Sequence, residues 1–131
     1  MQLLLAIINY LVANGILLGD GIDAFRDFMP EEPDFVVVLQ EYRGDPVSQY
    51  TTNVHRSVQV KVRARSADAA RNVAISICAA LRSGTEDLRI DFSENTWGQV
   101  YVRQLPFKLQ QDGSNRVTYC FNLGITTNIL E

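Results

Sequence analysis

The sequence predicts an α+β fold, in which an antiparallel sheet of about four strands packs one main helix on one face, with an additional N-terminal helix beside it. The first observation is a two-residue apolar period over 54–65 that passes without a gap into a helical period over 67–82. The second is a final hairpin, in which two alternating segments flank a turn at Asp112-Gly113. Since each element has one apolar face, we expect strand, helix and hairpin to share a core.

The first element expected along the chain is a helix that ends at Gly15. Leucine, isoleucine and valine cover most of its circumference, and residues 2, 6, 9 and 13 form one narrow stripe of small or polar side chains. No basic segment precedes the apolar run, and it is shorter than the roughly 20 residues that span a membrane. We therefore expect a helix that lies deep in the fold or shares its apolar surface with another subunit.

Residues 19–24 superficially resemble a dinucleotide-binding glycine loop. Such a loop follows a strand and opens a helix whose N-terminus holds the pyrophosphate. Here a helical period precedes it, and Asp20 and Asp23 would repel phosphate. A turn is the favoured interpretation.

The segment Met29-Pro30-Glu31-Glu32-Pro33 interrupts regular structure, because each proline restricts its predecessor to extended conformations. Its carboxylates, together with Asp34, raise the alternative of a cation site. No further ligands cluster nearby in sequence, so we expect a solvated acidic loop.

A strand is expected over Phe35–Tyr42, where β-branched residues are enriched. The turn sequence Arg43-Gly44-Asp45-Pro46 ends it. The polar segment Val47–Asn53 is expected to be a flexible loop leading into the next strand.

The strand Val54–Arg65 is expected to have one apolar and one basic face, because successive side chains of a strand point to opposite sides. The apolar face contains Val58, Val60 and Val62, whereas the opposite, solvated face would contain His55, Ser57, Gln59, Lys61, Arg63 and Arg65. With no second histidine or cysteine beside it, His55 is expected to be an exposed strand residue.

The helix Ala67–Arg82 follows at once. Ser66 is placed to cap its N-terminus, Asp68 suits the positive end of the helix dipole, and Gly84 would end it. Apolar positions recur at helical spacing and define the buried face: Ala70, Val73, Ala74, Ile77, Cys78 and Leu81.

Two further strands and a short segment complete the expected sheet. Leu88, Ile90 and Phe92 alternate, which indicates a brief strand or packed loop, and Gln99–Leu109 is expected to be a strand. The last strand, Arg116–Ile125, should direct Val117, Tyr119, Phe121, Leu123 and Ile125 to one face.

Composition indicates an ordinary globular chain, and we expect a single domain over residues 1–131. The formal net charge of −3 argues against a dedicated nucleic-acid binder. Cys78 and Cys120 are expected on different faces, which predicts reduced thiols rather than a disulfide. Asp91 and Glu94 are the nearest approach to an acid/base pair, but no partner that would shift a pKa is evident. We therefore expect no catalytic residues, no cofactor and no metal.

The order of these elements resembles the minor capsid and tail-terminator proteins of long-tailed bacteriophages. The resemblance spans residues 3–125 and rests on three motifs in order: the Met29–Pro33 loop, the strand end Glu41-Tyr42-Arg43-Gly44, and the helix start Ser66-Ala67-Asp68-Ala69-Ala70. It implies a virion structural protein, assembled in the host cytoplasm, that caps the tail tube as a homohexameric ring at the head–tail junction. The implied partners are copies of the chain, the tail tube protein and the head connector or completion proteins. The genome would pass through the ring without specific binding, and neither an enzymatic activity nor a membrane is implied.

The sequence also suggests which residues would meet these partners. A ring needs two different patches that match, and a basic row and an acidic loop are candidates for subunit or partner contacts. These candidate residues are Lys61, Arg63, Arg65, Glu31, Glu32 and Asp34.

Two other functions stay open from the sequence. One is a head-completion or other minor capsid protein of the same virion class. The other is a DNA-contacting module that would use Lys61, Arg63, Arg65 and Arg103.

Overall fold

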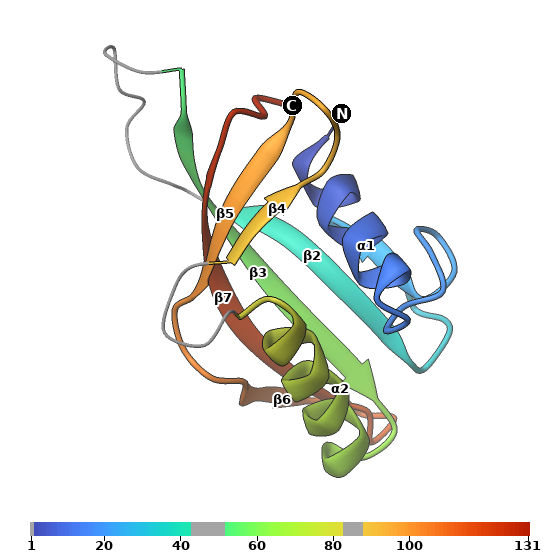
Figure 1. Ribbon diagram of the computed structural model, residues 1–131. Coiled ribbons are helices and arrows are strands. Elements are labelled where there is room, and N and C mark those ends of the chain that lie inside the picture. Colours follow the sequence, from blue (N-terminus) through green and yellow to red (C-terminus); the bar gives the residue numbers. More distant parts are fainter. Residues whose placement is uncertain (1, 43–51, 83–87) are drawn as a thin grey trace.

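The computed structural model describes residues 2–42, 52–82 and 88–131 (Figure 1). This part of the chain forms two helices and a seven-stranded sheet of order β1-β2-β3-β7-β5-β4, with β6 paired to β7 beside β5. Only the β1–β2 pair is parallel among the strand pairs of this sheet. The elements are α1 (Leu3–Ala13), β1 (Ala24–Arg26), β2 (Val36–Tyr42), β3 (Val54–Ala64), α2 (Ala67–Ala80), β4 (Leu88–Asp91), β5 (Trp97–Val102), β6 (Phe107–Gln111) and β7 (Val117–Thr127).

The α+β class is confirmed, but the expectation of about four strands is too low. The expected strand Gln99–Leu109 is two strands, because β5 and β6 pair with different parts of β7 on either side of Pro106. The brief strand around Ile90 is confirmed as β4. β1 was not expected, since three residues are too few to show a period.

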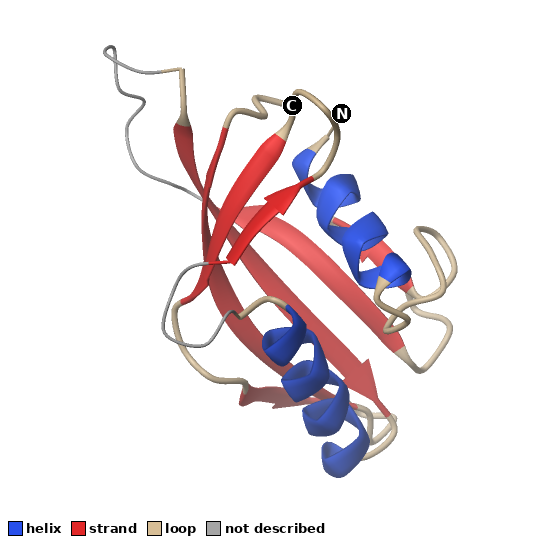
Figure 2. Cartoon of the chain, in the orientation of Figure 1, coloured by secondary structure: helices blue, strands red, loops and turns tan. Residues whose placement is uncertain are grey.

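Both helices cover the same face of the sheet, and their side chains form one core with it (Figure 2). The predicted buried face of α2 is confirmed: Ala70, Ala74 and Ile77 are fully buried, and Val73 packs against the core. Ser66 caps α2 as expected, because its hydroxyl accepts the Ala69 N–H at 3.1 Å.

The N-terminal helix is confirmed as an element buried around most of its circumference. Leu3, Ile7, Ile8 and Leu11 are inaccessible to solvent, whereas Asn9 and Ala13 of the expected polar stripe are exposed. The Leu3 N–H also donates to the Glu131 carbonyl at 2.9 Å, which joins the start of α1 to the C-terminal segment. No helix in the described ranges is both long and apolar enough to cross a membrane.

The sheet face that points away from the helices is less solvated than expected. Arg63 is only 5% exposed and Ser57 only 2%. For Arg63 the physical reason is the topology of β1 and β2: because they are parallel, the chain between them must return to the start of β2, and it passes Arg63 as it does so. Ser57 is instead in contact with Arg103.

Several expectations fall outside the described residues. They are the turn Arg43–Pro46, the first five residues of the loop Val47–Asn53, and the helix stop at Gly84.

Candidate functional site

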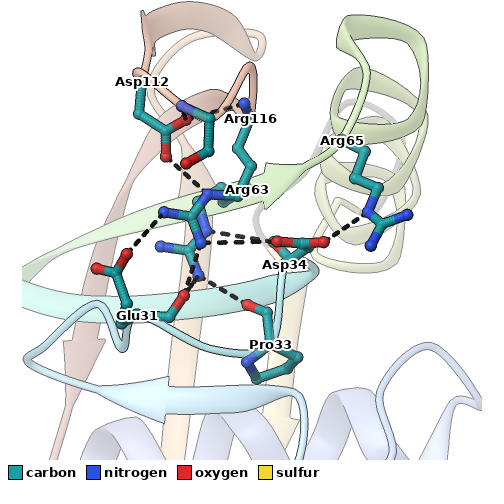
Figure 3. A network of polar contacts seen from close by, with 8 residues as sticks. Glu31, Pro33, Asp34, Arg63, Arg65, Asp112 and Arg116 are labelled. Carbon is teal, nitrogen blue, oxygen red and sulfur yellow. Dashed lines mark hydrogen bonds and ion pairs between the residues drawn. The ribbon is translucent and has the colours of Figure 1, made fainter.

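The acidic loop and the basic strand residues predicted from the sequence lie together in one chain. Arg63 donates from Nη2 to the Pro33 carbonyl at 2.7 Å and to the Glu31 carbonyl at 3.2 Å (Figure 3). Its Nε donates to the Asp34 carbonyl at 3.2 Å. The Arg63 guanidinium therefore binds the backbone of residues 31–34, hereafter the arginine-held loop, instead of facing solvent.

A second arginine binds the same loop from the start of β7. Arg116 donates from Nη1 to the Glu31 carbonyl at 2.6 Å, and its side chain is 8% exposed. Its Nε donates to Asp112 Oδ2 at 2.7 Å. The carboxylates of Glu31 and Asp34 lie 3.5 and 3.7 Å from this guanidinium. The loop is thus fixed by two cations through its own carbonyls.

The electrostatics of the cluster follow from placing two guanidinium groups close together. Burial and the nearby charge of Arg116 lower the pKa of Arg63. A hydrogen bond to Asp112 raises the pKa of Arg116, against the cost of burial. Burial alone would raise the pKa of Asp112, but hydrogen bonds from Arg116 and Ser114 outweigh it and hold that pKa below its usual range. The Asp112 carboxylate is therefore the counter-ion that stabilises the Arg116 guanidinium close to the guanidinium of Arg63.

The predicted interface residues divide into a buried and an exposed set. Arg65 is exposed, and its Nε donates to Asp34 Oδ2 at 2.5 Å. The Glu31 side chain is 88% exposed, and Glu32 is also exposed. Lys61 is half-buried, two residues before Arg63 on β3. The expectation of a continuous, solvated basic row is wrong, because Arg63 at its centre is buried and binds the backbone of the arginine-held loop.

Sequence reasoning missed Arg116 and Asp112 as members of this site. Asp112 accepts the Ser114 and Arg116 N–H groups, each at 2.9 Å, and so closes the turn between β6 and β7. Asn115 adopts a positive φ of 63° in the same turn. The sequence did contain a signal for this pair, because an aspartate that opens a turn is followed four residues later by an arginine that can reach its carboxylate.

A second polar cluster lies on the same sheet face, around Arg103. Its guanidinium donates to Ser57 Oγ at 3.1 Å and to the Tyr101 and Tyr42 hydroxyls at 3.3 Å. The Tyr101 ring lies directly against Gly124, where a Cβ would stand 2.0 Å from the ring. Arg103 in this cluster and Arg63 at the arginine-held loop are therefore bound within the chain, and they are two of the four cations that a DNA-contacting surface was expected to use.

Asp91 and Glu94 are the residues that come nearest to an acid/base pair in the sequence. Asp91 lines a groove of about 240 Å³ between α1 and β4, with Ala6, Asn9, Tyr10 and Ile90 among its neighbours. Its carboxylate lies 3.3 Å from Arg89 Nε in an exposed ion pair. Within residues 2–42, 52–82 and 88–131, no three histidine, cysteine or acidic side chains are grouped so that they would hold a metal ion.

These features are those of a small α+β protein whose charged groups fix loops and line its surface. Residues 10–129 match the family model described as bacteriophage tail terminator protein, and the chain therefore belongs to that family. A comparison with curated proteins found no match. The predicted resemblance is confirmed at the level of the family: the protein has a structural role in the phage tail and is a virion component.

Proposed function

We propose that this protein caps the phage tail tube as a homohexameric ring and provides the surface to which the head is joined. Support comes from the family match, which extends over residues 10–129 and so includes the sheet, α2 and the arginine-held loop. A closed ring requires two different patches on each subunit that match across the rotation. The genome passes through the ring without specific binding, in keeping with the net charge of −3.

The arginine-held loop is the proposed contact with a neighbouring virion protein. Glu31, Glu32 and Asp34 are on a backbone segment that Arg63 and Arg116 already fix. A fixed loop loses less conformational entropy on binding than a mobile one, which favours affinity. Because the loop is held within its own chain, it needs no partner to order it.

Lys61 and Arg65, the members of the basic row that are not buried, complete this surface. Arg65, the residue after β3, pairs with the Asp34 carboxylate, and Lys61 lies on β3 two residues before Arg63, which binds the backbone of the loop. We therefore assign Lys61 and Arg65 to partner recognition together with the three carboxylates, and we assign Arg63 to positioning.

Complementation of a phage that lacks this protein tests the proposal. The wild-type chain should restore tails of uniform length joined to heads in electron micrographs, and it should purify with tails isolated free of heads. Glu31→Lys with Glu32→Lys should reduce head joining, because both side chains are exposed. Asp68→Lys, which changes an exposed carboxylate on α2, is the matched control. Normal joining by the loop variant would remove the loop from the proposed surface. Normal tails without any copy of the protein would refute the function itself.

A further inference from the structure

Three large apolar side chains are exposed where the chain enters and leaves β1. Leu18, Ile22 and Phe28 are 73%, 59% and 58% exposed. Their segment has contacts of its own: the Asp23 carboxylate accepts the Leu18 backbone N–H at 2.9 and 3.0 Å, and the Phe28 ring packs edge-on against Phe25 at 5.6 Å. We refer to Leu18, Ile22 and Phe28 as the β1-edge patch.

A second group of three lies on and just before β6. Leu105, Phe107 and Leu109 are 68%, 41% and 42% exposed, and Leu109 lies at a shift in the β6–β7 register. Every residue of β6 is exposed, and among the described strands β6 pairs with β7 alone. Its outer edge therefore presents backbone hydrogen-bonding groups beside apolar side chains, an arrangement suited to a protein contact. We refer to these three residues as the β6-edge patch.

The two patches lie at opposite sides of the sheet. β1 is the terminal strand on one side, and β2, β3 and β7 separate it from β6 (Figure 1). One copy of the chain can therefore contact two neighbours at once, one through each patch. This is the arrangement that a head-to-tail ring needs.

The charges around the two patches are opposite. Residues 17–28 contain three carboxylates and one arginine, and because Asp23 is buried, the groups left at the surface (Asp20, Asp27 and Arg26) have a net charge of −1. Residues 103–111 contain one arginine, one lysine and no carboxylate, a net charge of +2. Pairing either patch with itself across a two-fold axis would bring like charges together, whereas pairing one with the other brings opposite charges together.

We propose that the β1-edge patch of one copy packs against the β6-edge patch of the next copy, so that these two surfaces form the subunit interface. This inference rests on the proposed function, since it identifies how copies of the capping protein meet. Burial of the six apolar side chains drives the contact, and the acidic and basic surroundings set its direction.

Chemical cross-linking tests the pairing directly. The variant Ile22→Cys with Phe107→Cys places one thiol in each patch, and a bismaleimide reagent joins thiols that meet across an interface. The native Cys78 and Cys120 are 3% and 0% exposed, so the wild-type chain gives little background. Each single variant, and the pair Leu130→Cys with Phe107→Cys, in which Leu130 is 75% exposed outside both patches, are the matched controls. The reagent is applied to virions that contain each variant and to purified protein at several concentrations.

The double variant is expected to give a ladder of covalent multimers, whereas the controls stay at the monomer mass. Absence of the ladder in both preparations would overturn the inference, as would a dimer from either single variant or cross-links only to other virion proteins. A different result would refute the proposed function: cells that lack the protein would make tails of uniform length joined to heads. That result is independent of whether the double variant gives the ladder of multimers.

Discussion

Two buried arginines define the site at the scale of single residues. Removing a guanidinium from water costs free energy, which is recovered only where its N–H groups and charge find partners. Arg63 is partnered by three carbonyls, and Arg116 by one carbonyl and Asp112. These contacts make the shape of the loop depend on β3 and β7.

Replacing Arg63 by methionine removes the donors but keeps a long side chain. The carbonyls of Glu31, Pro33 and Asp34 then lose a partner, so we expect the free energy of unfolding to fall by about 1–3 kcal/mol. Urea denaturation followed by circular dichroism measures it. Arg65→Met is the control, because that side chain is 85% exposed and a surface ion pair contributes at most about 1 kcal/mol. Equal losses for the two variants would contradict the role given to Arg63.

The Asp112 carboxylate makes the free energy of unfolding depend on pH in the acidic range. Its pKa is lower in the folded state than in the unfolded chain, so its contribution is present above the unfolded value, about 3.9, and is lost as pH falls through the folded value. Asp112→Asn should therefore unfold more easily than wild type near neutral pH and lose less stability between about pH 4 and pH 2. Thermal unfolding across that range tests this. Parallel pH profiles for the two proteins would show that Asp112 is not the responsible carboxylate.

The absence of a side chain at Gly124 leaves room for the ring of Tyr101. A methyl group there would meet the ring at 2.0 Å, so Gly124→Ala should displace Tyr101 and cost about 1–3 kcal/mol of stability. In a Tyr101→Ala background the same change should cost clearly less, since the obstacle is gone. A double-mutant cycle from chemical denaturation gives the coupling between the two positions. Additive losses would mean that the ring and the glycine are independent.

At the scale of elements, the helix α2 has one buried and one exposed face. Ile77 is 0% exposed, so Ile77→Asp buries a charge and should destabilise the protein by more than about 4 kcal/mol. Ile75→Asp is a matched control on the same helix, where the isoleucine is 49% exposed, and it should cost less than about 1 kcal/mol. Denaturation midpoints compare them, and similar midpoints would contradict the predicted orientation of α2.

Elements with a long apolar period could be predicted from the sequence, and short ones could not. β3 and α2 have enough residues to show their periods, and Asp112-Gly113 marked the final hairpin. The division between β5 and β6 depends on where each meets β7, which is tertiary information. The prolines and carboxylates of residues 29–34 indicated a loop, but its contact with Arg63 depends on the return path between β1 and β2, which no local pattern specifies.

At the scale of the whole molecule, the sheet separates two apolar edges of opposite charge. Both helices lie on one face, and the arginine-held loop lies on the other (Figures 2 and 3). The proposed subunit contacts therefore use the edges of the sheet, while the loop is left available to a neighbouring virion protein. Under the proposed function, this division of surfaces lets one small chain both close a ring and dock it.

Cryo-electron microscopy of the head-proximal end of the tail, in virions complemented with the wild-type chain, tests this account most directly. The account predicts a ring of six copies on the last layer of the tail tube, with β1 of each subunit against β6 of the next and the acidic loop facing an adjoining protein. A ring joined through other surfaces, or density for this chain elsewhere in the particle, would contradict it.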